Sequence, residues 1–228
     1  MIELQNVTKR YGKKANIFVA LDDVSLKIPE ATTVAIIGKS GSGKSTMMHV
    51  MSGLDKATSG TITIGKRAFS ELSQRQMDAF RSQQMSFIFQ SFFVQGNESC
   101  FNNVSLPLEI ANIPGSKRKA MVMKALNAVE LGDKAKQRAR DLSGGQKQRL
   151  AIARAIVNKP KILFADEPTG NLDSTTGDTI EKLLFDYAKD NKATLIVVTH
   201  DPDLAKKCDM QVHIKDGKIQ KIDQKGKK

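Results

Sequence analysis

Runs of apolar residues predict most of the strands in this 228-residue chain. Near the N-terminus, apolar and polar residues alternate over 2–8 and again over 20–28, which predicts two half-buried strands. Polar residues 12–14 suit a turn between them, so we expect an antiparallel edge. Four later runs lack this alternation and predict strands buried on both faces, as in a parallel sheet: 34–37, 87–89, 162–165 and 195–199.

Helical periodicity dominates the middle of the chain. Apolar side chains recur at helical spacing over 117–131, and the surrounding stretch, about 70–141, has few strand signals. Further helices are indicated at 45–52 and 147–157. The pattern predicts an α/β fold with a mainly parallel sheet, an antiparallel β edge subdomain and an inserted α-helical subdomain at about 70–141. At this length we expect one domain, residues 1–228.

The apolar runs are strand-length, far below the roughly 18 residues needed to span a bilayer. The first residues lack the basic-then-apolar order of a signal peptide, so we expect the protein to stay in the cytoplasm. Cys100 and Cys208 match no metal-ligand spacing. Buried or incidental thiols are therefore expected in place of a disulfide.

Basic residues are concentrated in two places. The net charge is +12, with ten Lys/Arg against three Asp/Glu in 117–149, and six Lys against two Asp in the basic C-terminal tail at about 215–228. A solvated surface, an anionic membrane surface or nucleic acid would each fit such charge. Nucleic acid is the least favoured partner, because no aromatic residues interleave with the charges. We expect the Lys-rich last dozen residues to be mobile.

One glycine-rich segment has the spacing of a phosphate-binding loop. The sequence Gly38-Lys-Ser-Gly-Ser-Gly-Lys-Ser45 lies between a predicted strand and a predicted helix, which a flexible Gly/Ser turn would not require. Glycines let backbone N–H groups turn toward phosphate oxygens at the helix N-terminus. We expect Lys44 to hold the β- and γ-phosphates and the Ser45 hydroxyl to ligate Mg²⁺. The predicted nucleotide contacts are Gly38, Ser40, Gly41, Ser42, Gly43, Lys44, Ser45 and Thr46.

Two carboxylates follow the apolar run 162–165. A strand buried in a parallel sheet places its last residues at the carboxyl edge, where ligands bind in such folds. There Asp166 can hold the Mg²⁺ shell, and Glu167 can act as the general base on the attacking water. Together with the phosphate loop, this pair predicts a P-loop NTPase core.

A third motif distinguishes among P-loop proteins. Leu142-Ser-Gly-Gly-Gln146, followed by a helical run with the order Gln-Arg-Leu-Ala-Ile-Ala-Arg-Ala, resembles the signature of the ABC ATPase family. The resemblance to this family covers about residues 1–220 of the chain. Ser143, Gly144 and Gly145 at a helix start would form a second anion-binding end. In that family the signature meets ATP held by the opposite subunit. The resemblance therefore implies ATP contacts from 143–146, Gln146 included, and a head-to-tail homodimer.

Other residues fall where the family places its remaining site residues. Tyr11 resembles the aromatic residue that stacks on adenine, although a packing role is the alternative. Gln90 resembles the Q-loop glutamine, which contacts Mg²⁺ and the attacking water. The resemblance places Asp173 in a D-loop that crosses between subunits, and it gives His200 contact with the γ-phosphate.

The segment Gly170-Asn-Leu-Asp173 is similar to that of the lipoprotein-releasing, macrolide-export, bacitracin-resistance and FtsE cell-division cassettes, whose membrane partners often transmit force across the bilayer. Gln90-Ser-Phe92 fits the same group. Two segments depart from its pattern. Residues 93–104 replace a leucine-rich run and a Glu-Asn-Val, and 138–140 stand where a proline is common. These departures leave the identity of the membrane partner open.

The resemblance implies an ATPase that uses ATP and Mg²⁺, dimerises with a second copy and drives a separate transmembrane permease from the cytoplasmic face of the membrane. ATP would close the dimer, and hydrolysis at Glu167 would reopen it. The alternative function is a non-transport ABC ATPase acting on nucleic acid or ribosomes. Such relatives carry a long coiled coil or two cassettes in one chain, and neither feature is found in this sequence.

Overall fold

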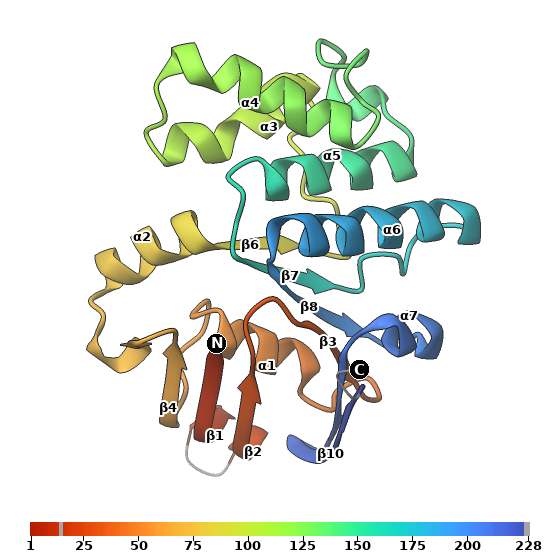
Figure 1. Cartoon of the computed structure of the whole chain (residues 1–228). Helices are drawn as coiled ribbons and strands as arrows, with labels where there is room; N and C mark the ends of the chain where they lie inside the picture. The colour runs from red at the N-terminus through yellow and green to blue at the C-terminus, as the bar shows by residue number, and fades with distance from the viewer. Residues whose placement is uncertain (14–15, 226–228) are drawn as a thin grey trace. The chain divides into compact units, whose positions relative to one another are not determined.

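The computed structural model describes residues 1–13 and 16–225. The described chain forms two compact units, one comprising Met1–Arg81 with the chain from Thr194 onward, the other Ser82–Ala193. Each unit is described by itself below, with the element labels of Figure 1.

The first unit contains the antiparallel sheet expected from the alternating N-terminal segments. Its strand order is β2-β1-β4-β5, and Ile2 of β1 lies opposite Ile28 of β2 and Ile64 of β4 (Figure 1). The predicted turn at 12–14 includes Lys14, which lies outside the described residues. The sheet consists of β1 (Ile2–Tyr11), β2 (Phe18–Ile28), β4 (Ser59–Ile64) and β5 (Arg67–Ala68), with a 3-10 turn, η1 (Phe69–Glu71), after it.

The same unit contains parallel strands whose side chains are buried. Strand β3 (Thr33–Ile37) pairs in parallel with β8 (Thr194–Thr199) and with β9 (Met210–Lys215). Every residue of β8 is buried, as a continuous apolar run predicts. The helices of this unit are α1 (Lys44–Met51), the first two turns of α2 (Gln74–Gln84) and α7 (Pro202–Lys207).

The prediction that the last dozen residues are mobile is wrong for most of them. Residues Lys218–Gln224 form β10, which pairs antiparallel with β9. Asp216 and Gly217 have φ values of 50° and 74°, the left-handed conformation of a two-residue hairpin turn. The lysines of β10 remain solvated while its backbone bonds to β9, so a basic composition alone does not predict disorder. Residues 226–228 lie outside the described part.

The second unit contains two parallel strands, β6 (Met85–Ile88) and β7 (Ile162–Asp166), and mostly helices around them. Helices α3, α4 and α5 pack on one another (Figure 1), with Leu108, Leu126 and Leu150 fully buried. The helical elements are α3 (Cys100–Ile110), α4 (Gly115–Ala128), η2 (Ala139–Asp141), α5 (Gly144–Ile156) and α6 (Ser174–Asn191). That residues 70–141 form an inserted subdomain with these bounds stays a prediction.

Both cysteines are buried, and Cys208 donates to the Leu204 carbonyl oxygen from its thiol. Among the helices of the described residues, none is long and apolar enough to cross a membrane.

Candidate functional site

The glycine-rich loop joins β3 to α1 in the conformation that a phosphate loop needs. Gly41 and Gly43 have φ values of 75° and 104°, which L side chains rarely adopt. A Cβ on Gly43 would also lie 2.5 Å from the Ala20 carbonyl oxygen. Gly43 is the N-cap of α1, and no side chain caps the helix there. The first N–H groups of α1 are therefore left for a ligand.

Two side chains of this loop suit an anionic ligand. The Lys44 Nζ donates to the carbonyl oxygens of Gly38 at 2.9 Å and Lys39 at 3.0 Å, which uses two of its three donors. The Ser42 Oγ is buried and has no hydrogen-bond partner among the described residues. The loop thus holds the Lys44 ammonium beside its own carbonyl groups, and the Ser42 hydroxyl is a further donor. Ser45 and Thr46 follow on the first turn of α1.

His200 lies at the same edge of the sheet as the phosphate loop. In the parallel ladder Ile37 pairs with Thr199, so Gly38 and His200 each come one residue after a paired position on neighbouring strands. Asp201 then caps α7, accepting from the backbone N–H of Asp203 at 2.7 Å. The sequence-predicted γ-phosphate contact is therefore next to the predicted phosphate loop within the first unit.

Tyr11 ends β1 with its side chain partly open to solvent, at 39% exposure. Its hydroxyl donates to Asp55 Oδ2 at 2.7 Å. The ring is therefore fixed to the loop that follows α1, and it does not have the buried environment of a core residue.

In the second unit, Gln90 and Glu167 follow two paired strands. Ile88 pairs with Ala165, and the two residues lie at the common carboxyl edge. A Cβ on Gly170 would lie 3.3 Å from Gln90 Nε2 and 3.5 Å from Glu167 Cβ, so both side chains border this glycine. Glu167 has a φ of 46°, an uncommon value for a non-glycine residue and one that clusters at functional sites. Asp166 is half-buried at the end of β7.

A buried glutamine outside the predicted site residues supports this turn. Gln148 on α5 is 1% exposed, and its Nε2 donates to the Pro168 carbonyl oxygen at 2.6 Å. Pro168 directly follows Glu167, so α5 holds the turn that carries the predicted general base. The sequence offers one signal for its role: Gln148 is a polar residue on the otherwise apolar face of a predicted helix, and a buried amide needs a hydrogen-bond partner.

The signature motif forms a capped helix start exposed to solvent. The Ser143 Oγ accepts from the Gln146 backbone N–H at 3.3 Å, and the Gln146 side chain accepts from the Ser143 N–H at 3.0 Å. Ser143 and Gly144 are exposed. Because the hydroxyl oxygen serves as the acceptor in this cap, the hydroxyl proton can still be donated to a ligand.

Asp173, in the predicted D-loop, bonds a threonine that lies beside the signature. Its carboxylate accepts from the Thr176 backbone N–H at 3.0 Å and the Thr176 hydroxyl at 2.8 Å, and these bonds lower the pKa of Asp173. A Cβ on Gly145 would lie 2.7 Å from Thr176 Cγ2. The start of α6 is therefore packed against the second glycine of the signature.

The second unit brings together Gln90, Asp166 and Glu167 at the ends of β6 and β7, and its signature contacts the start of α6, which Asp173 caps. The first unit places His200 beside the phosphate loop and bonds Tyr11 to Asp55. The family model described as "ABC transporter" matches residues 21–170. The chain belongs to the ABC transporter family.

Relatives of this cassette have similar lengths. It is 38% identical over 97% of its length to the lipoprotein-releasing system ATP-binding protein LolD of Wigglesworthia glossinidia brevipalpis, 96% of which is covered. Among solved structures, a dimeric structure of MJ0796, a bacterial ABC transporter cassette, superposes with a TM-score of 0.90 at 38% identity, covering 98% of both chains. A dimeric post-hydrolysis structure of the same cassette, bound to ADP and Pi, has the same score and coverage at 37% identity.

These similarities support the activity implied by the signature motif. The chain is an ATP-binding and ATP-hydrolysing cassette of an ABC transporter, with the fold class that the sequence predicts.

The two segments that depart from the group pattern are hydrogen bonded to each other in this cassette. The backbone N–H groups of Ala139 and Arg140 donate to Glu98 and Gly96 carbonyl oxygens, each at 2.9 Å. The buried Asn103 fixes the same loop, since it accepts from the Gln95 N–H at 2.8 Å. Residues 95–99 and 138–140 therefore lie side by side.

Proposed function

We propose that this cassette binds MgATP between two copies of itself, arranged head to tail, and that hydrolysis drives a separate membrane permease. The observation that carries this proposal is the second anion-binding helix end. The phosphate loop before α1 and the exposed signature before α5 are each built to receive phosphate, and they lie in different units of the chain. A second copy would let each phosphate loop meet a signature.

The residue types present fit Mg²⁺. Ser45 offers a half-buried hydroxyl on the first turn of α1, and Asp166 and Gln90 offer oxygens at the carboxyl edge of β6 and β7. Hard oxygen donors such as these, with phosphate oxygens and water, suit the ion. We assign Ser45, Asp166 and Gln90 as its protein ligands. When bound, Mg²⁺ would neutralise charge that develops on the phosphates.

The remaining roles follow from the environment of each side chain. Lys44 holds the β- and γ-phosphates with its remaining donor, and the Ser143 hydroxyl donates to the γ-phosphate of the opposite copy. Glu167 accepts a proton from the attacking water, in a turn that Gln148 supports. His200, one residue beyond the β3–β8 pairing, contacts the γ-phosphate. Tyr11 stacks on adenine, and Asp173 positions the signature through Thr176.

The permease is proposed from the relatives. The LolD protein is named as part of a lipoprotein-releasing system, and the segment Gly170–Asp173 resembles that of cassettes whose partners transmit force across the bilayer. We infer a membrane-embedded partner and a location at the cytoplasmic face of the membrane. Action on nucleic acid or ribosomes is the competing outcome.

The test uses a tagged Glu167→Gln variant, expressed in the native cell and trapped with ATP in gently solubilised membranes. We expect ATP binding to be retained, a long-lived dimer, hydrolysis lowered by about 100-fold or more, and co-purification of a permease. Wild-type hydrolysis would remove Glu167 from the mechanism. Ribosomes or DNA without a membrane protein would overturn the transport proposal.

A further inference from the structure

A partly buried ion pair lies beside the ring of Tyr11. Lys9 is two positions before Tyr11 on β1, so the two side chains leave the same face of the strand. The Lys9 side chain is 11% exposed, and its Nζ donates to Asp55 Oδ1 at 2.6 Å and to the Lys56 carbonyl oxygen at 2.8 Å. A lysine is rarely buried this far without partners. The same ammonium lies 4.7 Å from the centroid of the Tyr11 ring.

Asp55 links the ammonium to the tyrosine hydroxyl. Its Oδ1 accepts from Lys9 and from the Lys56 backbone N–H at 2.7 Å, while Oδ2 accepts from Tyr11. Burial alone would raise the pKa of Asp55, but the hydrogen bonds from Lys9, Tyr11 and the backbone lower it. Burial and the bond to Asp55 both raise the pKa of Tyr11, so its hydroxyl remains a donor. The ring is therefore held at its face by a cation and at its hydroxyl by a carboxylate.

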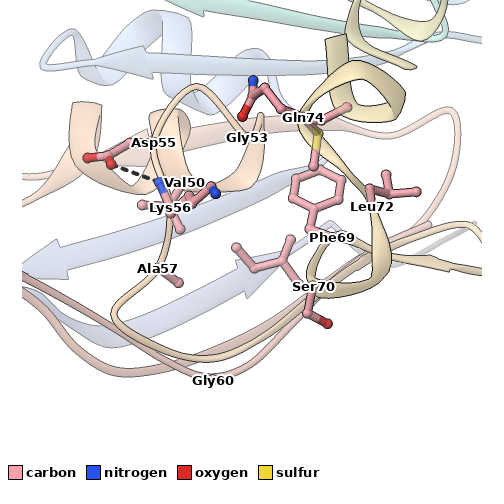
Figure 2. Close-up of a pocket in the computed structure, with 12 residues that line it drawn as sticks. Val50, Gly53, Asp55, Lys56, Ala57, Gly60, Phe69, Ser70, Leu72 and Gln74 are labelled. Atoms are coloured by element: carbon pink, nitrogen blue, oxygen red, sulfur yellow. Dashed lines mark hydrogen bonds between the residues drawn. The ribbon is translucent and has the colours of Figure 1, made fainter. Parts of the chain in front are cut away.

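The loop that carries Asp55 is backed by a cavity. A space of about 220 Å³ lies between α1, β4, η1 and α2, and residues 53–57 supply part of its wall. Figure 2 shows Asp55 at the border of this cavity, bonded to the Lys56 N–H. Packing fixes a loop weakly on a side that has few partner atoms. The bonds from Lys9 and a bond from the Asp55 N–H to the His49 carbonyl oxygen at 3.1 Å hold it in place.

We propose that Lys9 and Asp55 are positioning residues that hold the Tyr11 ring for adenine stacking and thereby set the affinity for nucleotide. This inference rests on the proposed function, in which Tyr11 stacks on the base. Because the Lys9 ammonium covers one face of the ring, the base binds to the other face. A ring that is already ordered loses less conformational entropy when the base binds.

The experiment measures ADP affinity by titration calorimetry and the KM and kcat for ATP. Tyr11→Ala should weaken ADP binding about tenfold, the usual effect of losing one base–aromatic stack. Lys9→Met and Asp55→Asn should weaken it about three- to tenfold, since the freed side chain must be ordered on binding. We expect KM to rise and kcat at saturating ATP to stay within about twofold, because uniform binding is lost.

Double variants separate positioning from folding. In a Tyr11→Ala background, Asp55→Asn should change ADP affinity no further, because the ring through which it acts is absent. Tyr11→Phe, which removes only the hydroxyl, should weaken binding less than Tyr11→Ala and keeps the test usable if Lys9→Met does not fold. Asp78→Asn is the matched control: Asp78 pairs with Arg81 in the same unit and is not among the groups that bond Tyr11.

The inference is overturned if Asp55→Asn weakens ADP binding equally with and without Tyr11, or if it leaves binding unchanged while Tyr11→Ala weakens it. Wild-type binding by Tyr11→Ala, with binding lost in Lys44→Ala, would remove adenine stacking but leave the role of the phosphate loop. Wild-type binding by Lys44→Ala would refute the proposed function itself.

Discussion

Replacing Gln148 with methionine is expected to separate hydrolysis from folding. The variant loses the 2.6 Å bond to the Pro168 carbonyl oxygen, and an unpaired buried acceptor costs about 1–3 kcal/mol. It also removes the Gln148 Oε1, a buried atom without a partner among the described residues, whose penalty is of the order of 1–3 kcal/mol. Methionine has a similar volume. Because these terms oppose each other, the free energy of unfolding should change by about 1 kcal/mol or less, and Tm by no more than about 4 °C.

Hydrolysis should respond more strongly than stability. Pro168 follows Glu167, so the turn that carries the proposed general base loses a restraint, and kcat should fall about tenfold or more because misplacement by about 1 Å can cost about 100-fold. Phosphate release at saturating MgATP and thermal unfolding are the two measurements. Gln137→Met is the control, since the Gln137 side chain donates to an exposed carbonyl oxygen, that of Asp141. A Gln148→Met protein with wild-type kcat, or one destabilised by more than about 3 kcal/mol, would refute this reasoning.

Two further predictions concern packing and pH. Gly145→Ala places a Cβ 2.7 Å from Thr176, so it should lower the free energy of unfolding by about 1–3 kcal/mol. In Gly144→Ala the nearest neighbour of the new Cβ would be 4.0 Å away, so the free energy of unfolding should change by less than about 1 kcal/mol. Equal denaturant midpoints for the two variants would contradict this. Because the folded-state pKa of Asp55 is lowered, its contribution is present above the unfolded value of about 3.9 and is lost as pH falls through the folded value. The Tm difference between wild type and Asp55→Asn should therefore be constant from about pH 8 to 5 and shrink below about pH 4, and a loss near pH 6 would argue against it.

Local patterns predict the buried strands well. The predicted strands at 34–37 and 195–199 begin one residue late and end correctly, because both are continuous apolar runs that need no knowledge of their neighbours. The periodic run alone predicts a helix over 147–157, whereas the signature motif places a helix start at 143–145, where the structure begins α5 with a capping box of Ser143 and Gln146. The helix propensity of its glycines is poor, and the cap outweighs it.

The long-range contacts of the site could not be predicted from local patterns. Lys9 and Asp55 are 46 positions apart, and Gln148 and Pro168 are 20 apart. Residue type indicates that each can hydrogen bond, but the partner depends on how β1 lies beside the loop after α1 and how α5 lies beside the turn after β7. The residues proposed to contact phosphate could be predicted because most of them lie in short contiguous motifs, whereas the residues that hold them in place are far apart in the sequence.

The bonds between residues 96–98 and 139–140 limit how these two segments can be exchanged with those of related cassettes. Because both bonds join backbone atoms, a relative's segment 93–104 would keep them only if its backbone followed the same path past Ala139 and Arg140. Those residues lie just before Leu142, where the signature begins. A chimera that takes a loop of different length or backbone path at 93–104 therefore has to take residues 138–140 from the same relative.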